Sequence, residues 1–316
     1  MKAIVMNAYG GPDVLELKEV DKPEITENDV LVDVHAASLN AGDYFSMRGS
    51  PWLARLTVGF PKPKDYILGW DVAGQVEAVG TNVTRFQPGD KVFASCDAAF
   101  AEYACAPEGK CAMTPTNLTL EQAAAVPSAA MTALHALRDQ ANVQPGQKVL
   151  INGASGGVGT FAVQIAKSLG AEVTGVCSTR NVDMVQSIGA DHVIDYTKED
   201  FTKSGQRYDL ILDNVGNRSF ADCRGALSPG GTHLPNTGHG GMTYVIKAYM
   251  LSAFMGEHAR PFLSVPNAED LLYIKDLIEA GKVMPVIDRT YPMSETPEAL
   301  RYLEEEHAQG KVVIIT

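Results

Sequence analysis

The sequence predicts an α/β protein in which a β-rich domain is combined with a doubly wound parallel sheet. Three observations predict this fold class. The chain has 316 residues, which is more than one hydrophobic core usually organises. Its beginning alternates short strand patterns with turn signals, whereas its middle alternates strands with helices. A glycine-rich turn, ASGGVG, joins the first of these middle strands to a helix.

The β-rich domain is predicted from residue 1 to about residue 120. Turn signals such as GGPD, FPKP and QPGD separate its strands. The strand patterns are VLVDVHAASLN, DVAGQVEAVG, GDKVFAS and FAEYACAP. A helical stretch over residues 117–147 follows, and Pro127 is predicted to mark a kink or a boundary within it.

The parallel sheet is predicted from residue 148 onward. KVLIN is typical of a buried strand, and the next helix, predicted to end at Gly170, has apolar residues at 3.6-residue spacing. These apolar residues are Val158, Phe161, Ala162, Ile165, Ala166 and Leu169. Four further strands are predicted at EVTGVC, HVIDY, YDLILDNV and GGTHLPN, and a sixth at FLSVP.

The end of the chain is predicted to return to the β-rich domain. A helix, a strand pair, a second helix and a last strand are predicted at AEDLLYIKDLIEAG, VIDRTYPM, PEALRYLEEEHAQG and KVVIIT. A terminal strand that follows the sixth sheet strand makes the parallel-sheet domain an insertion. The predicted limits are residues 1–122 and 267–316 for the β-rich domain and residues 123–266 for the inserted one.

Composition argues against several classes of function. Hydrophobic residues make up 45% of the chain and charged residues 20%, which suits a globular protein rather than a disordered one. A net charge of -12 without a basic run argues against nucleic acid and favours a small-molecule partner. The five cysteines lack disulfide-like spacing and no export segment is evident, so we expect a cytoplasmic location. No apolar run reaches spanning length, so we expect no membrane insertion.

The glycine-rich turn predicts a dinucleotide site. Ala154, Gly156 and Gly159 stand where a G-x-G-x-x-G pattern has its glycines, so the first glycine is missing. The turn follows a buried strand, opens an amphipathic helix and reaches a second strand about 20 residues on, which is the context that the motif requires. Main-chain N–H groups and the helix N-terminus can approach a pyrophosphate there. The alternative is a packing turn without a ligand.

The residues after the second strand predict which dinucleotide binds. An acid at this point would bond the ribose hydroxyls and repel a 2′-phosphate, but the sequence has Ser178, Thr179 and Arg180. Hydroxyls and a guanidinium favour the extra phosphate, so we predict NADPH as the cofactor. The alternative for Arg180 is a solvated loop residue.

These motifs resemble those of the medium-chain dehydrogenase/reductase superfamily, and within it the zinc-free quinone oxidoreductase branch. The resemblance covers essentially the whole chain. It is carried by MKAIVMNAYGGPDVLEL, ASLNAGDYFSMRG, LGWDVAGQVEAVGTNVTRFQPGDKVFA, INGASGGVGTFAVQIAKSLGAEVTGVCSTRN, GADHVIDY and GKVVIIT. It implies a GroES-like catalytic domain in the β-rich part, a Rossmann domain in the parallel sheet and, as a family expectation, a homodimer.

The resemblance also implies that no catalytic metal is bound. In zinc-dependent relatives the first ligand is a cysteine that falls near Asn40, and the second is a histidine that falls at Trp70. Neither residue can bind zinc in the usual way. The three cysteines between residues 96 and 111 lack the fourth cysteine of a structural zinc lobe, and we expect them to be small buried hydrophobic residues.

Without zinc, the predicted chemistry is hydride transfer to an activated acceptor. Zinc enzymes stabilise an alkoxide at the metal, whereas a quinone or an α,β-unsaturated carbonyl spreads the incoming charge over conjugated oxygen. The resemblance places Asn40 and Asp43 beside the nicotinamide and Thr132 at its carboxamide region. Tyr44 is either a functional hydroxyl or a pocket-edge aromatic, because Phe45 stands where the family often has a tyrosine. Water is the alternative proton source.

The resemblance assigns further cofactor contacts. Those at the pyrophosphate are Ser155, Gly156, Gly157 and Val158, and those at the 2′-phosphate end are Ser178, Arg180 and Tyr196. Val215 and Thr237 follow the fourth and fifth strands, at the edge where such sheets bind ligands, or are ordinary loop residues. Lys311 either reaches a phosphate or is a solvated turn cation.

Two other functions stay open. A 2-enoyl-thioester reductase would need an elongated slot and a cationic mouth, for which the sequence has no clear basic cluster. A non-enzymatic NADPH-binding structural or regulatory protein is the other alternative, since one fold can carry several functions. We expect an NADPH-dependent, zinc-independent reductase of quinones or enones.

Overall fold

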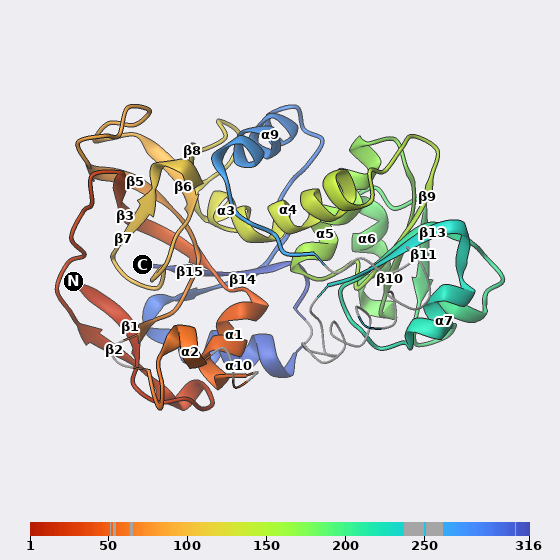
Figure 1. Ribbon diagram of the computed structural model, residues 1–316, viewed down its shortest axis with the longest axis horizontal. Coiled ribbons are helices and arrows are strands. Elements are labelled where there is room, and N and C mark those ends of the chain that lie inside the picture. Colours follow the sequence, from red (N-terminus) through yellow and green to blue (C-terminus); the bar gives the residue numbers. More distant parts are fainter. Residues whose placement is uncertain (51, 53–54, 64–65, 237–249, 251–261, 307) are drawn as a thin grey trace. The chain divides into compact units, whose positions relative to one another are not determined.

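A computed structural model describes the chain except residues 51, 53–54, 64–65, 237–249, 251–261 and 307 (Figure 1). The described residues form three sheets, of five, seven and three strands. The five-stranded sheet is parallel, and the seven-stranded sheet is mostly antiparallel. The mixed α/β class predicted from the sequence is therefore confirmed.

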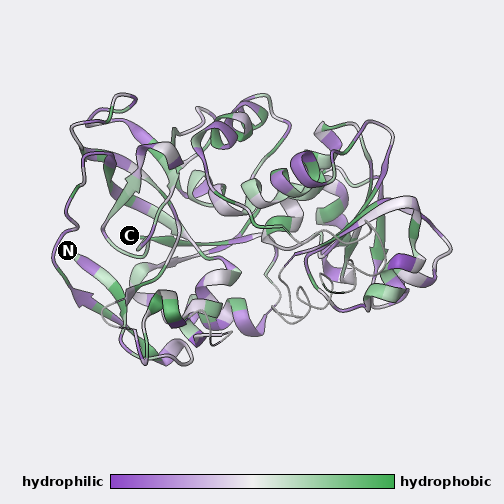
Figure 2. Cartoon of the chain, viewed as in Figure 1, coloured by the Kyte–Doolittle hydropathy of each residue, from purple (hydrophilic) through white to green (hydrophobic). Residues whose placement is uncertain are grey.

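The five-stranded sheet has the order β11-β10-β9-β12-β13. Its strands are β9 (Lys148–Asn152), β10 (Glu172–Cys177), β11 (His192–Asp195), β12 (Tyr208–Asp213) and β13 (Leu227–Pro235). Val149 of β9 faces Val173 on one side and Leu210 on the other, and all three are buried. The hydrophobic residues of these strands can be followed in Figure 2. The strand order reverses direction at β9, as a doubly wound sheet requires.

The helices of this part of the chain begin with α4 (Pro127–Leu134), which precedes β9 and continues as a π-helical stretch, His135–Gln140. Pro127 is thus the first residue of a helix, a position where its missing N–H leaves no hydrogen bond unmade. The others are α5 (Gly157–Ser168), α6 (Val182–Ser187) and α7 (Phe220–Gly225), with short 3-10 helices at Thr179–Asn181 and Phe201–Lys203.

Two predicted strand assignments are wrong. FLSVP forms no strand, because residues 262–267 have no regular secondary structure. Leu263 is 85% exposed and Val265 61% exposed, so the apolar side chains of this segment do not line a sheet face, and Pro266 lacks an N–H for a strand ladder. VIDRTYPM forms one strand, β14 (Ile287–Pro292), instead of a pair.

The seven-stranded sheet has the order β14-β15-β3-β5-β6-β8, with β7 paired to β3. Its other strands are β3 (Asp29–Ser38), β5 (Asp71–Val79), β6 (Lys91–Ser95), β7 (Tyr103–Pro107), β8 (Cys111–Met113) and β15 (Lys311–Ile315). Strand β15 runs antiparallel to β3, with Val313 opposite Ser38. The last strand of the chain therefore completes a sheet that begins near its start.

The three-stranded sheet consists of β2 (Leu15–Glu19), β1 (Lys2–Met6) and β4 (Tyr66–Ile67) in that order. The α-helices of this part of the chain are α1 (Ala41–Arg48), α2 (Arg55–Val58), α3 (Leu120–Ala124), α9 (Ala268–Glu279) and α10 (Thr296–Glu305). Short 3-10 helices lie at Pro12–Val14, Glu108–Lys110 and Met293–Glu295.

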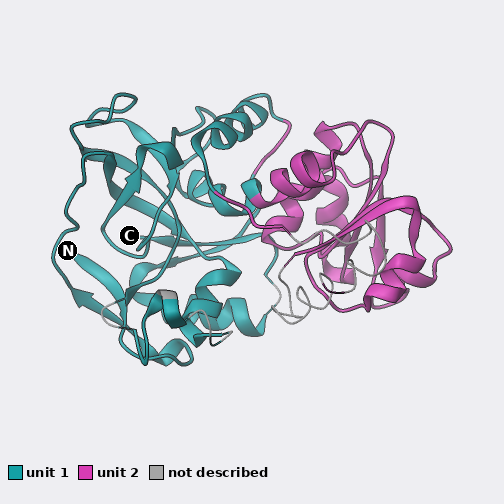
Figure 3. Cartoon of the chain, in the orientation of Figure 1, with its two compact units in different colours: residues 1–131, 266–281, 285–316 teal, residues 132–265, 282–284 magenta. Residues whose placement is uncertain are grey.

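The chain divides into two compact units (Figure 3). Unit 1 comprises Met1–Met131, Pro266–Gly281 and Pro285–Thr316, and unit 2 comprises Thr132–Val265 and Lys282–Met284. We propose that these units correspond to the two predicted domains, with limits at residues 122 and 267. Within the described ranges, we find no helix with both the length and the apolar character needed to cross a membrane.

Candidate functional site

The glycine-rich turn of unit 2 lies between β9 and α5. Gly153 adopts φ 79°, and Gly156 is the N-cap of α5, which begins at Gly157. A Cβ on Gly159 would lie 2.0 Å from the Gly153 carbonyl oxygen, so only glycine lets the helix pack this closely on the turn. A Cβ on Gly156 would meet its nearest neighbour at 3.5 Å, which leaves this side of the turn open. The turn fits a pyrophosphate at the helix N-terminus.

The predicted pyrophosphate residues are neighbours in this turn. Ser155, Gly156, Gly157 and Val158 span its last two residues and the first two of α5, and all are half-buried. The helix of 12 residues carries no acidic residue in its first turn that would repel an anion. The structure therefore brings this part of the predicted site together.

The predicted 2′-phosphate residues lie where β10 and β11 end. Ser178 follows β10, and Arg180 is exposed in the 3-10 helix after it. Tyr196 follows β11, is 43% exposed, and donates its backbone N–H to the Cys177 carbonyl oxygen at 3.0 Å. The ends of the two strands are thus held side by side.

One acid at this edge was not considered in the sequence-based prediction. Asp195 ends β11 and accepts hydrogen bonds from the hydroxyls of Thr179 at 2.5 Å and Thr197 at 2.7 Å. These bonds hold the pKa of the Asp195 carboxyl well below its usual range, and Lys198 lies 2.9 Å from the carboxylate. The acid is ionised but accompanied by a cation, so the edge as a whole stays compatible with a phosphate.

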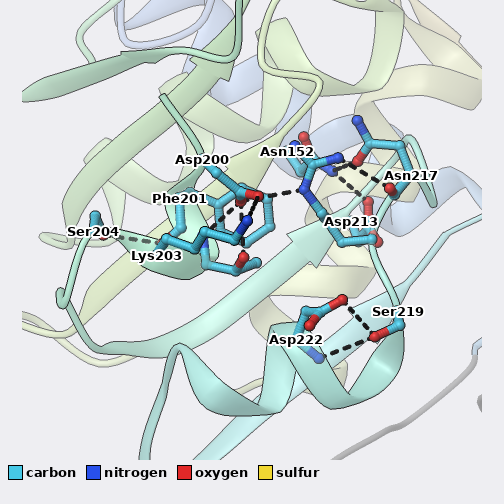
Figure 4. A network of polar contacts seen from close by, with 11 residues as sticks. Asn152, Asp200, Phe201, Lys203, Ser204, Asp213, Asn217, Ser219 and Asp222 are labelled. Carbon is cyan, nitrogen blue, oxygen red and sulfur yellow. Dashed lines mark hydrogen bonds and ion pairs between the residues drawn. The ribbon is translucent and has the colours of Figure 1, made fainter. Parts of the chain in front are cut away.

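The loop after β12 is fixed by the polar contacts drawn in Figure 4. Asn152, at the end of β9, donates from Nδ2 to Asp213 Oδ1 at 2.8 Å and to Asn217 Oδ1 at 3.1 Å. The same Asp213 oxygen accepts the backbone N–H groups of Val215 at 3.1 Å and Gly216 at 2.9 Å. This network holds Val215 at the carboxyl edge of the sheet. The other residue predicted at this edge, Thr237, lies outside the described residues.

The second part of the predicted site lies in unit 1, around Asn40. Asn40 is the N-cap of α1, and its backbone N–H donates to Asp43 Oδ2 at 2.8 Å. Its side-chain Nδ2 donates to Asp71 Oδ2 at 2.9 Å, and its Oδ1 accepts from Lys311 Nζ at 2.6 Å. Both ends of the amide are therefore held, which fixes the orientation of this side chain.

The structure contradicts one of the two roles predicted for Lys311. The expectation of a solvated turn cation is wrong, because the residue is only 2% exposed. Its ammonium group also donates to the Leu39 carbonyl oxygen at 2.8 Å and lies 3.8 Å from Asp71 Oδ2. Burial lowers the pKa of Lys311, and the carboxylates of Asp71 and Asp43 oppose that effect. An ammonium group engaged in this way gives no support to a phosphate contact.

Asp43 is fully buried and accepts the backbone N–H of Gly69 at 3.1 Å in addition to that of Asn40. Burial raises the pKa of Asp43 from 3.8 to about 7. Its carboxyl group joins the start of α1 to the loop before β5, and the geometry favours a positioning role over the chemical role predicted for it. Tyr44 is half-buried beside the hydrophobic core, and both roles weighed for it stay predictions.

Asp43→Asn is expected to remove a pH dependence from the stability of unit 1. Between the ordinary pKa of 3.8 and about 7, folded Asp43 binds a proton that the unfolded chain has lost. The free energy of unfolding therefore falls as pH rises through this window, by up to about 4 kcal/mol. Both tryptophans, Trp52 and Trp70, belong to unit 1, so their fluorescence reports its unfolding in urea.

From about pH 5 to about pH 8, the original chain should lose stability relative to Asp43→Asn. If the two proteins differed in free energy of unfolding by the same amount at about pH 5 and at about pH 8, the folded state would keep Asp43 ionised throughout.

The positions of the zinc ligands of zinc-dependent relatives are occupied by Asn40 and Trp70. The indole of Trp70 lies against α1, since a Cβ on Gly42 would fall 1.9 Å from its ring. In unit 2, Asp213, Cys223 and His233 each place one possible ligand atom within 4.8 Å of the others. Asp213 already accepts the three hydrogen bonds that fix the loop after β12, so we assign this buried group a structural role.

Besides Asp195, sequence reasoning missed two residues of these sites. Asp71 contacts Asn40, Lys311 and Ser128. The backbone N–H and the hydroxyl of Ser128 donate to Asp71 Oδ1 at 3.0 and 2.5 Å. Asn181 joins the Ser155 and Ser178 hydroxyls. Two features of the sequence could have found them. Asp71 is an acid at the position where zinc-dependent relatives have the glutamate of their GHE motif, and Asn181 directly follows Arg180.

Thr132 lies on α4 and is half-buried. It belongs to unit 2, whereas Asn40, Asp43 and Tyr44 belong to unit 1. The predicted nicotinamide contacts of these residues stay predictions.

Comparison with known proteins agrees with this arrangement. Residues 26–116 match the model of the alcohol dehydrogenase GroES-like domain, and residues 188–314 match that of the zinc-binding dehydrogenases. The chain is 36% identical to the chloroplast envelope quinone oxidoreductase homolog of Arabidopsis thaliana, over 99% of this chain and 98% of that protein. It is 33% identical to the chloroplastic NADPH-dependent alkenal/one oxidoreductase of the same plant, over 99% of this chain and 79% of that one.

A solved structure extends the agreement to the fold. The quinone oxidoreductase from Coxiella burnetii superposes with a TM-score of 0.90 at 33% identity, and covers 100% of this chain and 99% of its own. The resemblance inferred from the motifs is thereby confirmed. The chain belongs to the medium-chain dehydrogenase/reductase superfamily, among the homologues of the quinone oxidoreductases.

Proposed function

We propose that the chain is an NADPH-dependent oxidoreductase that reduces a quinone or an α,β-unsaturated carbonyl without a catalytic zinc. The observation that carries the proposal is the carboxyl edge of the parallel sheet. There Asn181 joins the hydroxyl of Ser155, in the glycine-rich turn, to the hydroxyl of Ser178, and Arg180 lies in the 3-10 helix that follows Ser178. The names of two relatives support the proposed cofactor and the proposed class of acceptor: one is a quinone oxidoreductase homolog, and the other is an NADPH-dependent alkenal/one oxidoreductase.

The proposed reaction moves two electrons to the acceptor. NADPH supplies a hydride from C4 of its nicotinamide, and a proton from solvent or from a side chain completes the reduction. A quinone becomes a hydroquinone, an enone becomes a saturated ketone, and NADP⁺ is released. The negative charge that develops on the acceptor is delocalised onto its own oxygen, so a hydrogen-bond donor can replace a metal.

Asn40 is the residue that we propose to orient the reactants. Its amide is half-exposed and is held between Asp71 Oδ2 at 2.9 Å and Lys311 Nζ at 2.6 Å. A fixed dipole costs no reorganisation when charge develops, which is the advantage of a preorganised site. The buried cation of Lys311 also places a positive charge next to this dipole, where zinc-dependent relatives have their metal ligands.

A panel of acceptors tests the proposal. NADPH oxidation is measured with an ortho-quinone, a para-quinone, a short enone, a 2-enoyl-CoA and a simple aldehyde. We expect turnover with the quinones or the enone and little with the aldehyde, because hydride addition to an aldehyde leaves a localised alkoxide that conjugation does not stabilise. Turnover with the enoyl-CoA alone would favour the thioester reductase. No turnover with any acceptor, while NADPH still binds, would favour the non-enzymatic binding protein.

Arg180→Ala is expected to weaken NADPH binding selectively. Loss of a charge-assisted hydrogen bond to the 2′-phosphate should cost about 1.5–3 kcal/mol, or roughly 10- to 150-fold in Kd. NADH lacks this phosphate, so its Kd should barely change. The measurement is titration of both nucleotides by isothermal calorimetry.

Arg224→Ala is the matched control, since Arg224 is also exposed but lies on α7, before the amino end of β13. If Arg180→Ala lost equal affinity for NADPH and NADH, Arg180 would not contact the 2′-phosphate.

We also propose that the chain is cytoplasmic and forms a homodimer. The names of the two plant relatives place them in the chloroplast, so the location of this chain must be measured separately. Analytical ultracentrifugation of the purified chain tests the dimer.

A further inference from the structure

Asn181 is a buried polar residue at the cofactor edge that no sequence motif singles out. It ends the 3-10 helix Thr179–Asn181 and is 2% exposed. Burying an amide is unfavourable unless it is hydrogen-bonded. Its Nδ2 donates to Ser155 Oγ at 2.9 Å and to Ser178 Oγ at 3.3 Å. One amide therefore connects the glycine-rich turn after β9 to the end of β10.

The chemistry of this amide fixes the direction of both hydrogen bonds. An NH₂ group only donates, so the two hydroxyl oxygens must accept. Each hydroxyl has a single hydrogen, which then stays available for an acceptor on its other side. Both serine side chains are half-exposed, so such an acceptor can reach them. Ionised phosphate oxygens are acceptors only, and they are the partners that two hydroxyls held in this way would favour.

We propose that Asn181 is a positioning residue for cofactor selection, and that it holds the Ser155 and Ser178 hydroxyls as donors to a nicotinamide nucleotide that carries a 2′-phosphate. The inference rests on the proposed function. It separates two contributions at this edge: Arg180 supplies charge, whereas Asn181 supplies hydrogen-bond direction. The Ser178 hydroxyl, at the end of β10, would serve the extra phosphate, and the Ser155 hydroxyl the pyrophosphate.

Two substitutions of Asn181 separate hydrogen-bond direction from shape. Asn181→Leu keeps the approximate volume and removes both donors. Asn181→Asp keeps the shape, but its carboxylate accepts hydrogen bonds, which turns both hydroxyl hydrogens inward and adds a negative charge. We expect the NADPH Kd to rise about tenfold in the first variant and about a hundredfold in the second. The NADH Kd should rise less, by about threefold and about tenfold, because NADH has the pyrophosphate that Ser155 would serve but lacks the 2′-phosphate that Ser178 would serve. If Asn181 had a purely structural role, binding of both nucleotides would weaken by the same factor, and that result would overturn the proposal.

The hydroxyls provide a test that does not depend on the folding of an Asn181 variant. Ser178→Ala should raise the NADPH Kd about fivefold or more and leave the NADH Kd unchanged. Ser187→Ala, an exposed serine on α6, is its control and should change neither. If Asn181 acts through the hydroxyls, Asn181→Leu should cause little further loss in a Ser155→Ala/Ser178→Ala chain. The inference would be contradicted if Asn181→Leu weakened NADPH binding as much in this chain as in the original one. An unaltered ratio of NADH Kd to NADPH Kd in Ser178→Ala would contradict it as well.

The outcomes also distinguish this inference from the proposed function. Binding is measured without an acceptor, so the result does not depend on which substrate is reduced. If the original chain binds NADPH no better than NADH, the predicted NADPH selectivity fails. If it prefers NADPH and the variants keep the same preference, only the role of Asn181 fails.

Discussion

Replacement of Lys311 with methionine is expected to lower the free energy of unfolding of unit 1 by about 3–5 kcal/mol. Lys311 is 2% exposed and Asp71 is fully buried, so methionine would leave a buried carboxylate without its cation. The same substitution removes the donor to Asn40 Oδ1 at 2.6 Å and the donor to the Leu39 carbonyl oxygen at 2.8 Å. Urea unfolding followed by tryptophan fluorescence measures this loss. Quinone turnover should fall as well, because the Asn40 amide is then held at one end only.

Lys18→Met is the control for this effect. Lys18 pairs with Glu16 at 2.6 Å on the surface of the same unit, and exposed pairs of this kind contribute about 0–1 kcal/mol. The double variant Lys311→Met/Asp71→Asn should recover part of the lost stability, since it removes both charges. If Lys311→Met were no more destabilising than Lys18→Met, the buried ion pair would have no structural importance.

Gly159→Ala is expected to have the second large effect. Its Cβ would lie 2.0 Å from the Gly153 carbonyl oxygen and 2.8 Å from Ala154 Cα. These are backbone atoms that cannot rotate away, so the turn or α5 must shift, at a cost of about 2–4 kcal/mol. Thermal unfolding followed by circular dichroism should show the loss, and NADPH binding should weaken because the N-terminus of α5 moves.

Gly156→Ala separates the role of the turn in packing from its role in binding. Gly156 has φ -85°, and its added Cβ would meet only the Gly153 oxygen, at an ordinary 3.5 Å. We expect the fold to keep its stability within about 1 kcal/mol, while NADPH binds at least about tenfold more weakly because the methyl group stands in the path of the pyrophosphate. Undiminished NADPH binding by a folded Gly156→Ala chain would contradict the placement of the pyrophosphate.

The sequence predicted the regular part of the fold well, because local patterns specify it. KVLIN is a continuous apolar run and forms the central strand β9, and the apolar spacing after it continues through α5. FLSVP is similarly apolar, yet it forms no strand. What separates the two segments is whether neighbouring strands are available to cover both faces, and that depends on tertiary context rather than on the segment itself.

The sites were predicted unevenly for the same reason. Ser155, Ser178 and Arg180 lie in motifs whose backbone context is local, and the structure places them at one sheet edge. Lys311 stands 271 residues from the Asn40 oxygen that accepts its hydrogen bond, so its burial follows only from the pairing of β15 with β3. Asn181 has no motif of its own, since its role depends on two hydroxyls that fold against it.

The most direct test of the central claim combines turnover with metal content on one sample. The purified chain is dialysed against a strong chelator, its zinc is measured by elemental analysis, and its oxidation of NADPH and NADH is followed with a para-quinone. We expect turnover to survive within about twofold in zinc-free protein, with kcat/KM at least about tenfold higher for NADPH than for NADH. Turnover that disappears with the chelated zinc and returns when zinc is restored would contradict the account.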